Sequence, residues 1–168
     1  MEQNNIKKLS ESLDSTDFKL LEALQTDASL NNQSLAERVH ISPPTCLRRI
    51  KRLHETGLIE RQIALLNPDK LSALLGHGLT AIIEITLDRQ GAGQLEAFEQ
   101  KVALQSAVQQ CYRVSPGPDF ILVVHVLDMP HYLALTRQLF TEDANVRNVK
   151  AFFSTKRSKF EPKVLLRQ

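Results

Sequence analysis

Residues 42–54, SPPTCLRRIKRLH, decide how the N-terminal part of this chain folds. Ser42 followed by Pro43 is typical of a helix start, because serine caps free N–H groups and proline lacks an N–H where none is needed. Gly57 suits the left-handed residue that closes a helix. The stretch therefore predicts one helix, ending at Glu55 or Thr56, whose apolar stripe is formed by Cys46, Ile50 and Leu53.

The polar and basic side chains of this helix lie away from the apolar stripe, and no acidic residue interrupts residues 42–54. Arginine and lysine can bind phosphates or guanine edges in a duplex groove, and the free N–H groups at the Ser42 end can hold a phosphate. A merely solvated charged face is the alternative, but such faces usually carry acids spaced for i,i+4 pairing. The candidate DNA-binding residues are Ser42, Pro43, Thr45, Arg48, Arg49, Lys51 and Arg52.

Two further helices are predicted before this one. The first covers residues 14–26 with Asp14 or Ser15 as its N-cap, and the second covers 31–39 with Asn31 as its N-cap. Three helices joined by tight turns have the organisation of a helix-turn-helix, the motif that places a helix in the DNA major groove. After them, residues 58–65 are expected to form a single strand that leads out of the helical unit.

The second half of the chain alternates between strand and helix patterns. Its predicted elements are strands at 79–87, 108–115, 119–127 and 146–153 and helices at 91–104 and 130–141. This β-α-β-β-α-β order is the ferredoxin-like arrangement. Because the helices of such a domain cover only one face of the sheet, we expect a second copy of the chain to cover the other face, giving a homodimer.

The 168 residues carry a formal net charge of +2, so a nucleic-acid partner would be recognised by local clusters of lysine and arginine. No apolar run reaches the ~20 residues of a membrane span, and residues 1–8 lack the apolar stretch of a signal peptide. Cys46 and Cys111 form no CxxC motif, which argues against a zinc site or a disulfide framework. We expect a soluble cytoplasmic protein with no metal and no cofactor.

Several motifs resemble those of the Lrp/AsnC (feast/famine) transcriptional regulators. The similarity runs from residue 13 to about 160, and its most specific part lies between Ser42 and Pro68. The motifs are Leu13-Asp14-x-Thr16-Asp17, Ser42-Pro43-x-x-Cys46-Leu47-x-Arg49-Ile50-x-Arg52-Leu53-x-x-x-Gly57-Leu58-Ile59, and Leu65-Leu66-Asn67-Pro68. The family often has glycine where this chain has His40, a residue that tolerates the left-handed conformation better than most.

The resemblance implies an α+β protein in which a winged-helix-like, three-helix DNA-binding domain precedes the ferredoxin-like domain. The expected boundaries are 13–64 for the helix-turn-helix domain, 65–78 for a hinge, and 79–160 for an effector-sensing and oligomerisation domain. It also implies a non-enzymatic, sequence-specific regulator of transcription that binds double-stranded DNA. Members form dimers that often assemble into octamers, and many respond to an amino acid such as leucine or methionine.

The effector site of the family includes a Gly-x-x-Asp turn, which corresponds here to residues 114–120. Pro116 replaces the expected glycine, and proline removes a backbone N–H that would hold a carboxylate. Asp119 is kept and can pair with an amino group; alternatively, it caps a rigid turn. The candidate effector-binding residues are Ser115, Gly117, Asp119, Met129 and Ser154.

Three alternatives stay open. An enzyme similar in fold to sirohaem decarboxylases would need histidines facing a tetrapyrrole, but His77, His125 and His131 form no recognisable constellation. An oligomeric ligand-binding module without DNA binding would not need the basic helix. The basic tail that runs from Lys156 to Arg167 either contacts DNA or is a solvated terminal segment.

Overall fold

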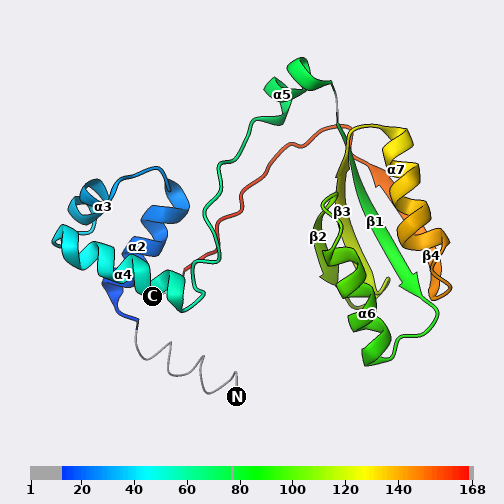
Figure 1. Cartoon of the computed structure of the whole chain (residues 1–168), viewed down its shortest axis with the longest axis horizontal. Helices are drawn as coiled ribbons and strands as arrows, with labels where there is room; N and C mark the ends of the chain where they lie inside the picture. Colours follow the sequence, from blue (N-terminus) through cyan, green and yellow to red (C-terminus); the bar gives the residue numbers. More distant parts are fainter. Residues whose placement is uncertain (1–12, 77, 167–168) are drawn as a thin grey trace. The chain divides into compact units, whose positions relative to one another are not determined.

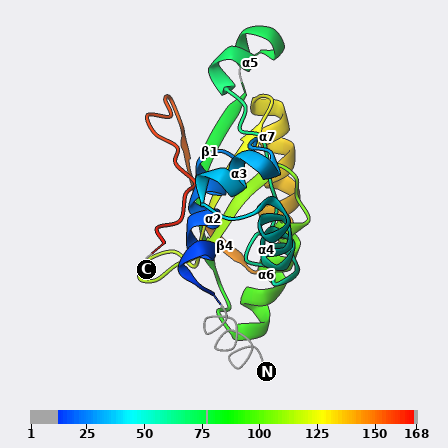
Figure 2. The ribbon, with the colours of Figure 1, turned by 90° about the vertical axis from the view of Figure 1, so that its left-hand side faces the viewer.

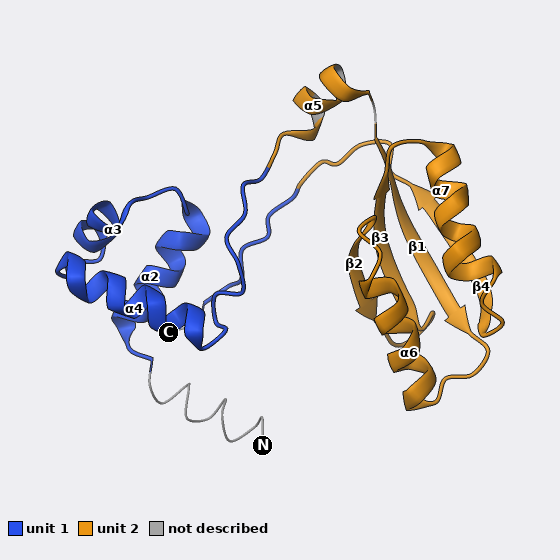
Figure 3. Cartoon of the chain, in the orientation of Figure 1, with its two compact units in different colours: residues 1–65, 160–168 blue, residues 66–159 orange. Residues whose placement is uncertain are grey.

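The computed structural model describes residues 13–76 and 78–166, which separate into two compact units (Figure 3). Residues 13–65 and 160–166 belong to the first unit, and residues 66–159 form the second. The C-terminal residues therefore group with the N-terminal helices and not with the sheet that precedes them. As a result, the chain passes between the units twice, once after Leu65 and once after Lys159.

The first unit contains three helices around a small core (Figure 1). They are α2 (Ser15–Thr26), α3 (Asn32–Arg38) and α4 (Pro43–Glu55), close to the predicted bounds. Asp14 is the N-cap of α2 and accepts the N–H groups of Thr16 and Asp17, while Asn31 caps α3 by accepting the Ser34 N–H. The buried apolar side chains are Leu20, Ala23, Leu35, Ala36, Val39, Cys46 and Leu53.

Two residues with positive φ close the turns of this unit. Gly57 follows α4 with φ +73°, which confirms its predicted place after the helix. His40 lies between α3 and α4 with φ +58°. This is the left-handed conformation expected at a position where the resembled family often has glycine. A histidine here adopts a conformation that costs L-residues about 1–2 kcal/mol.

The segment between the units differs from the prediction. Residues 58–65 form no strand, because an isolated extended segment has no neighbour to which its backbone can hydrogen-bond. The expected hinge contains a short helix, α5 (Pro68–Leu75). Asn67 caps α5 by accepting the Lys70 N–H at 3.1 Å, and Pro68 is the first residue of this helix.

The second unit confirms the predicted β-α-β-β-α-β order. Its strands are β1 (Leu79–Leu87), β2 (Val108–Arg113), β3 (Phe120–Val126) and β4 (Val146–Phe153). Besides α5, this unit contains the helices α6 (Ala92–Ala103) and α7 (Met129–Thr136), the latter extended by a π-helical turn at Arg137–Thr141. All strand pairs are antiparallel and the sheet order is β2-β3-β1-β4.

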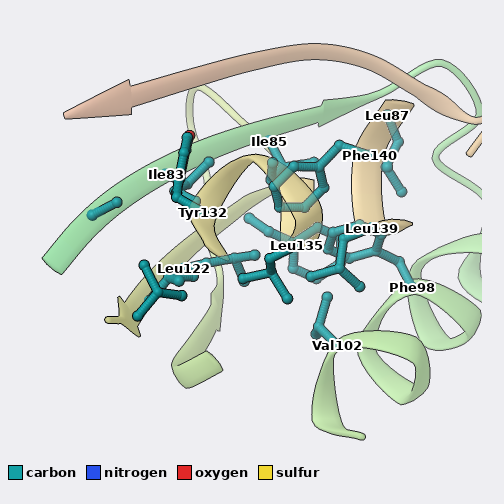
Figure 4. Packing of buried hydrophobic residues seen from close by; sticks show 14 residues of the cluster. Ile83, Ile85, Leu87, Phe98, Val102, Leu122, Tyr132, Leu135, Leu139 and Phe140 are labelled. Atoms are coloured by element: carbon teal, nitrogen blue, oxygen red, sulfur yellow. The ribbon is translucent and has the colours of Figure 1, made fainter. Parts of the chain in front are cut away.

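Both helices cover the same face of this sheet, and Figure 2 shows them on one side of β1. Alternate residues of β1 and β3 meet side chains from α6 and α7 in the core, part of which Figure 4 shows. The rings of Phe98 and Phe120 stack there with their centroids 4.7 Å apart. The opposite face of the sheet carries exposed apolar side chains, including Ile82 and Phe152. The fold thus provides a helical unit, and a sheet with one uncovered face.

Candidate nucleic-acid interface

The start of α4 is fixed by contacts with α3. The side-chain N–H of Asn32 donates to the Pro43 carbonyl at 2.9 Å, which joins the first residues of the two helices. Ser42 has the extended backbone of an N-cap, but its hydroxyl bonds the Thr45 hydroxyl at 2.8 Å instead of a backbone N–H. Because Pro43 and Pro44 lack N–H groups, the donors left for a phosphate at this end are the backbone N–H groups of Ser42 and Thr45.

The basic residues of α4 separate into two groups. Arg49 donates to Asp14 and to Asp17 at 2.9 Å each, and Arg52 donates to the other oxygen of Asp17. Asp17 is fully buried, and only 21% of the Arg49 side chain is exposed. Both arginines therefore connect α4 to the start of α2.

This arrangement corrects the expectation that all the basic side chains of the helix are available to DNA, because Arg49 and Arg52 bind Asp17. A buried carboxylate is unstable unless cationic partners donate hydrogen bonds to it. Arg49 and Arg52 are the two arginines that donate to Asp17. Hydrogen bonding to Asp17 also raises the pKa of Arg49. Asp14 and Asp17 form a reciprocal capping box, and their spacing is visible in the sequence. The sequence gives no local signal that Arg49 and Arg52 bind these two carboxylates.

The outward face of α4 consists of other residues. Leu47 has 61% of its surface exposed. Arg48 is exposed and has no hydrogen bond or ion pair among residues 13–76 and 78–166, while Lys51 lies 3.7 Å from Glu55 at the helix surface. Residues spaced i, i+3, i+4 and i+7 lie on one face of a helix. On the outward face of α4 these are Pro44, Leu47, Arg48 and Lys51.

The candidate effector residues fall into two places in the second unit. Ser115, Gly117 and Asp119 lie in the turn between β2 and β3, where Gly117 has φ +118°. One Asp119 oxygen accepts the Leu87 N–H at 2.6 Å and the Gln90 side-chain N–H at 3.2 Å. Asp119 therefore anchors the end of β1.

Met129 and Ser154 lie at the other end of the sheet. Met129 is the first residue of α7, and the Ser154 N–H donates to the Thr80 carbonyl at 2.9 Å. The Asp119 N–H donates to the Ile85 carbonyl, and Ile85 is five positions from Thr80 along β1, which is on the order of 17 Å at the usual strand rise. One copy of the chain does not bring all five candidate residues together.

Two of the described histidines bond neighbouring side chains. His125 bonds the Thr80 hydroxyl at 2.9 Å and His131 bonds Asp128, whereas His77 lies outside the described residues. In the part of the chain that the structure describes, no three His, Cys, Asp or Glu side chains gather as a metal site would require. None of the described helices combines the length and apolar character needed to cross a membrane.

Comparison with known proteins agrees with both halves of the fold. Residues 13–60 match a family described as winged helix-turn-helix DNA-binding, and residues 80–164 match the Lrp/AsnC ligand binding domain. A DNA-binding helix-turn-helix followed by a ligand-binding domain defines a transcription regulator. This chain belongs to the Lrp/AsnC family.

Individual relatives extend over most of the chain. An uncharacterized HTH-type transcriptional regulator of Haemophilus influenzae is 32% identical over 94% of this chain and 92% of its own length. The leucine-responsive regulatory protein of Escherichia coli K12 is 34% identical over 87% of each. A solved structure of a Neisseria meningitidis transcriptional regulator, in complex with L-Met, has 30% identity and a TM-score of 0.77 over 92% of this chain and 97% of its own.

Proposed function

We propose that this transcription regulator reads duplex DNA with the outward face of α4, formed by Pro44, Leu47, Arg48 and Lys51, together with Ser42 and Thr45 at its start. The observation that supports this proposal is that the basic residues of α4 fall into two groups. Arg48 and Lys51 extend into solvent, whereas Arg49 and Arg52 are held by Asp17. Pro43 contributes by starting the helix, and Arg49 and Arg52 contribute by positioning it.

The chemistry of this face suits a major groove. Arg48 can donate two parallel hydrogen bonds to a guanine edge, and Leu47 can contact a thymine methyl group. Lys51 is a point charge suited to a phosphate, which adds affinity without sequence preference. The combination predicts specificity from Arg48 and Leu47 and general affinity from Lys51.

The test uses a duplex selected from a random pool by the wild-type protein and measures affinity by fluorescence anisotropy. Arg48→Ala should weaken binding by about tenfold and relax the preference at one base pair. Lys51→Ala should weaken all duplexes alike and lower the slope of log affinity against log salt by about one. Arg147→Ala, an exposed arginine of β4, is the matched control. Equal affinities for the Arg48 and Arg147 variants would refute the assignment.

We also propose a homodimer that buries the uncovered face of the sheet. Ile82 of β1 lies directly between Val123 of β3 and Phe152 of β4, so the three side chains form an apolar row. Ile82 and Phe152 are 43% and 44% exposed. A second copy presenting the same row would bury both by two-fold symmetry.

The effector is proposed to be a small apolar amino acid, with methionine and leucine the first candidates. The support is the L-Met complex of the Neisseria relative and the names of the leucine-responsive relatives. Because the turn at Asp119 and the Met129–Ser154 end lie apart in one copy, a site using both would combine residues from different copies. An effector bound there would favour assembly beyond the dimer, toward the octamer.

Thermal unfolding in the presence of each of the twenty amino acids tests this proposal. Methionine or leucine should raise the Tm, because a ligand that binds only the native state stabilises it. Asp119→Asn should reduce the shift, and Asp88→Asn, an exposed acid after β1, should retain it. No Tm shift with any amino acid would exclude an amino-acid effector.

A further inference from the structure

We propose that residues 160–166, here called the tail, are a docking segment that binds a groove between α2 and α3. The tail would thereby tie the helical unit to the sheet-containing unit by a second connection. This inference concerns the chain without DNA and does not depend on how α4 contacts DNA.

The first observation is a reciprocal hydrogen-bond pair. The Val164 N–H donates to the Gln25 side-chain oxygen at 2.7 Å, and the Gln25 side-chain N–H donates to the Val164 carbonyl at 3.2 Å. One amide side chain of α2 thus satisfies both backbone groups of one tail residue, as a neighbouring strand would. Such a pair fixes the register of the tail along α2 and does not depend on the Val164 side chain.

The second observation is the groove itself. Leu166 lines it together with Phe18, Lys19, Glu22, Ala23 and Thr26 of α2 and Arg38 and Val39 at the end of α3. Leu166 is half-buried, whereas 92% of the neighbouring Leu165 is exposed. In an extended chain successive side chains alternate in direction, so Leu166 faces the helices when Leu165 faces solvent.

The location of the groove leaves α4 free. No residue of α4 is among the residues that line it, so the tail can stay docked while the outward face of α4 contacts another molecule. The helical unit is already connected to the second unit after Leu65, and the tail follows β4 through residues 154–159. This second covalent path keeps the effective concentration of the tail high and favours docking.

Docking has a consequence for movement. A unit held by one flexible segment reorients freely, but a unit held at two points has fewer orientations available to it. The tail would therefore transmit a displacement of β4 to α2. The contacts that attach the tail to the helical unit are made by the Val164 backbone and the Leu166 side chain.

Hydrogen–deuterium exchange of the full chain, followed by mass spectrometry, tests the proposal. Leu166→Asp places a charge in the groove and should raise exchange at least about threefold in peptides from α2 and the end of α3. Leu165→Asp introduces the same charge one residue earlier, where the side chain faces solvent, and should leave these peptides unchanged. Peptides from β1 should not respond to either substitution.

A second pair of variants removes the hydrogen bonds without adding charge. Gln25→Leu should raise exchange of the tail amides by a similar factor, whereas Gln33→Leu, on the exposed surface of α3, should not. Far-UV circular dichroism confirms that each variant is folded. Identical exchange for the Leu165 and Leu166 variants, or for the Gln25 and Gln33 variants, would overturn the proposal.

Discussion

At the residue scale, Asp17 has the strongest influence on the helical unit. Its carboxylate is fully buried, and its oxygens accept hydrogen bonds from Arg49, Arg52 and the Asp14 N–H. Removing one partner of a buried charged pair leaves the other charge buried and unpaired. The free energy of unfolding then falls by more than the intact pair had added to it. The basic face of α4 is therefore shaped by an acidic residue that lies outside the helix.

Asp17→Asn should lower the free energy of unfolding by about 2 kcal/mol, because the neutral amide cannot accept from both arginines. Urea denaturation followed by circular dichroism measures this change. Glu55→Gln is the matched control, since the exposed Lys51–Glu55 pair contributes little. A stability loss no larger than that of the control would show that the Asp17 pairs do not position α4.

Acid should weaken the same network. The Asp17 backbone N–H and the Arg49 guanidinium hold the pKa of Asp14 below its usual value of 3.8. A carboxyl with a lowered folded pKa contributes stability above its unfolded pKa and loses that contribution as the pH falls through its folded pKa. Asp14→Asn should therefore lose less stability than wild type between pH 7 and pH 3, measured by urea midpoints. An equal loss in both proteins would contradict this expectation.

At the element scale, the turn between α3 and α4 determines where the DNA-facing helix begins. His40 has φ +58°, and the Ile41 N–H that follows donates to the Ala36 carbonyl at 3.0 Å. This left-handed residue reverses the chain in the short space between Val39 and Ser42. Asn32 then holds the first residue of α4, so both ends of the turn are fixed.

His40→Gly should raise the free energy of unfolding by about 0.5–1 kcal/mol, because glycine adopts positive φ without strain. His54→Gly, within α4, should lower it by up to about 1 kcal/mol, because glycine is a poor helix former. The two urea midpoints should move in opposite directions from the wild-type value. A loss of stability in both variants would mean that His40 makes contacts that offset its backbone strain.

At the scale of the whole molecule, the uncovered sheet face exposes the apolar side chains of Ile82 and Phe152. Ile82→Asp should convert the proposed dimer into single chains, since a charge within a buried apolar interface has no partner. Size-exclusion chromatography with light scattering measures the mass. Leu104→Asp is the control, because Leu104 is 84% exposed at the end of α6 and away from this face. A dimer that persists in the Ile82 variant would place the interface elsewhere.

Among the described helices, α4 and α5 have proline as their first residue, and they show where prediction from the sequence succeeded and failed. Ser42-Pro43 predicted α4, and the apolar spacing of Cys46, Ile50 and Leu53 supported it. Asn67-Pro68 lies in the segment expected to be a hinge, yet it starts α5. The local signal is the same in both cases, and α5 has only eight residues, too few to show a clear helical period.

The sequence alone determined the element order, the caps at Asp14 and Asn31, and the left-handed Gly57, because these depend on residues close together in the chain. Tertiary structure decided which arginines of α4 are free, that Asp119 anchors β1, and that the tail returns to α2. Each of these depends on residues more than thirty positions apart. Periodicity identifies the side of a helix on which an arginine lies, but only the packing of α2 against α4 places a buried carboxylate beside it.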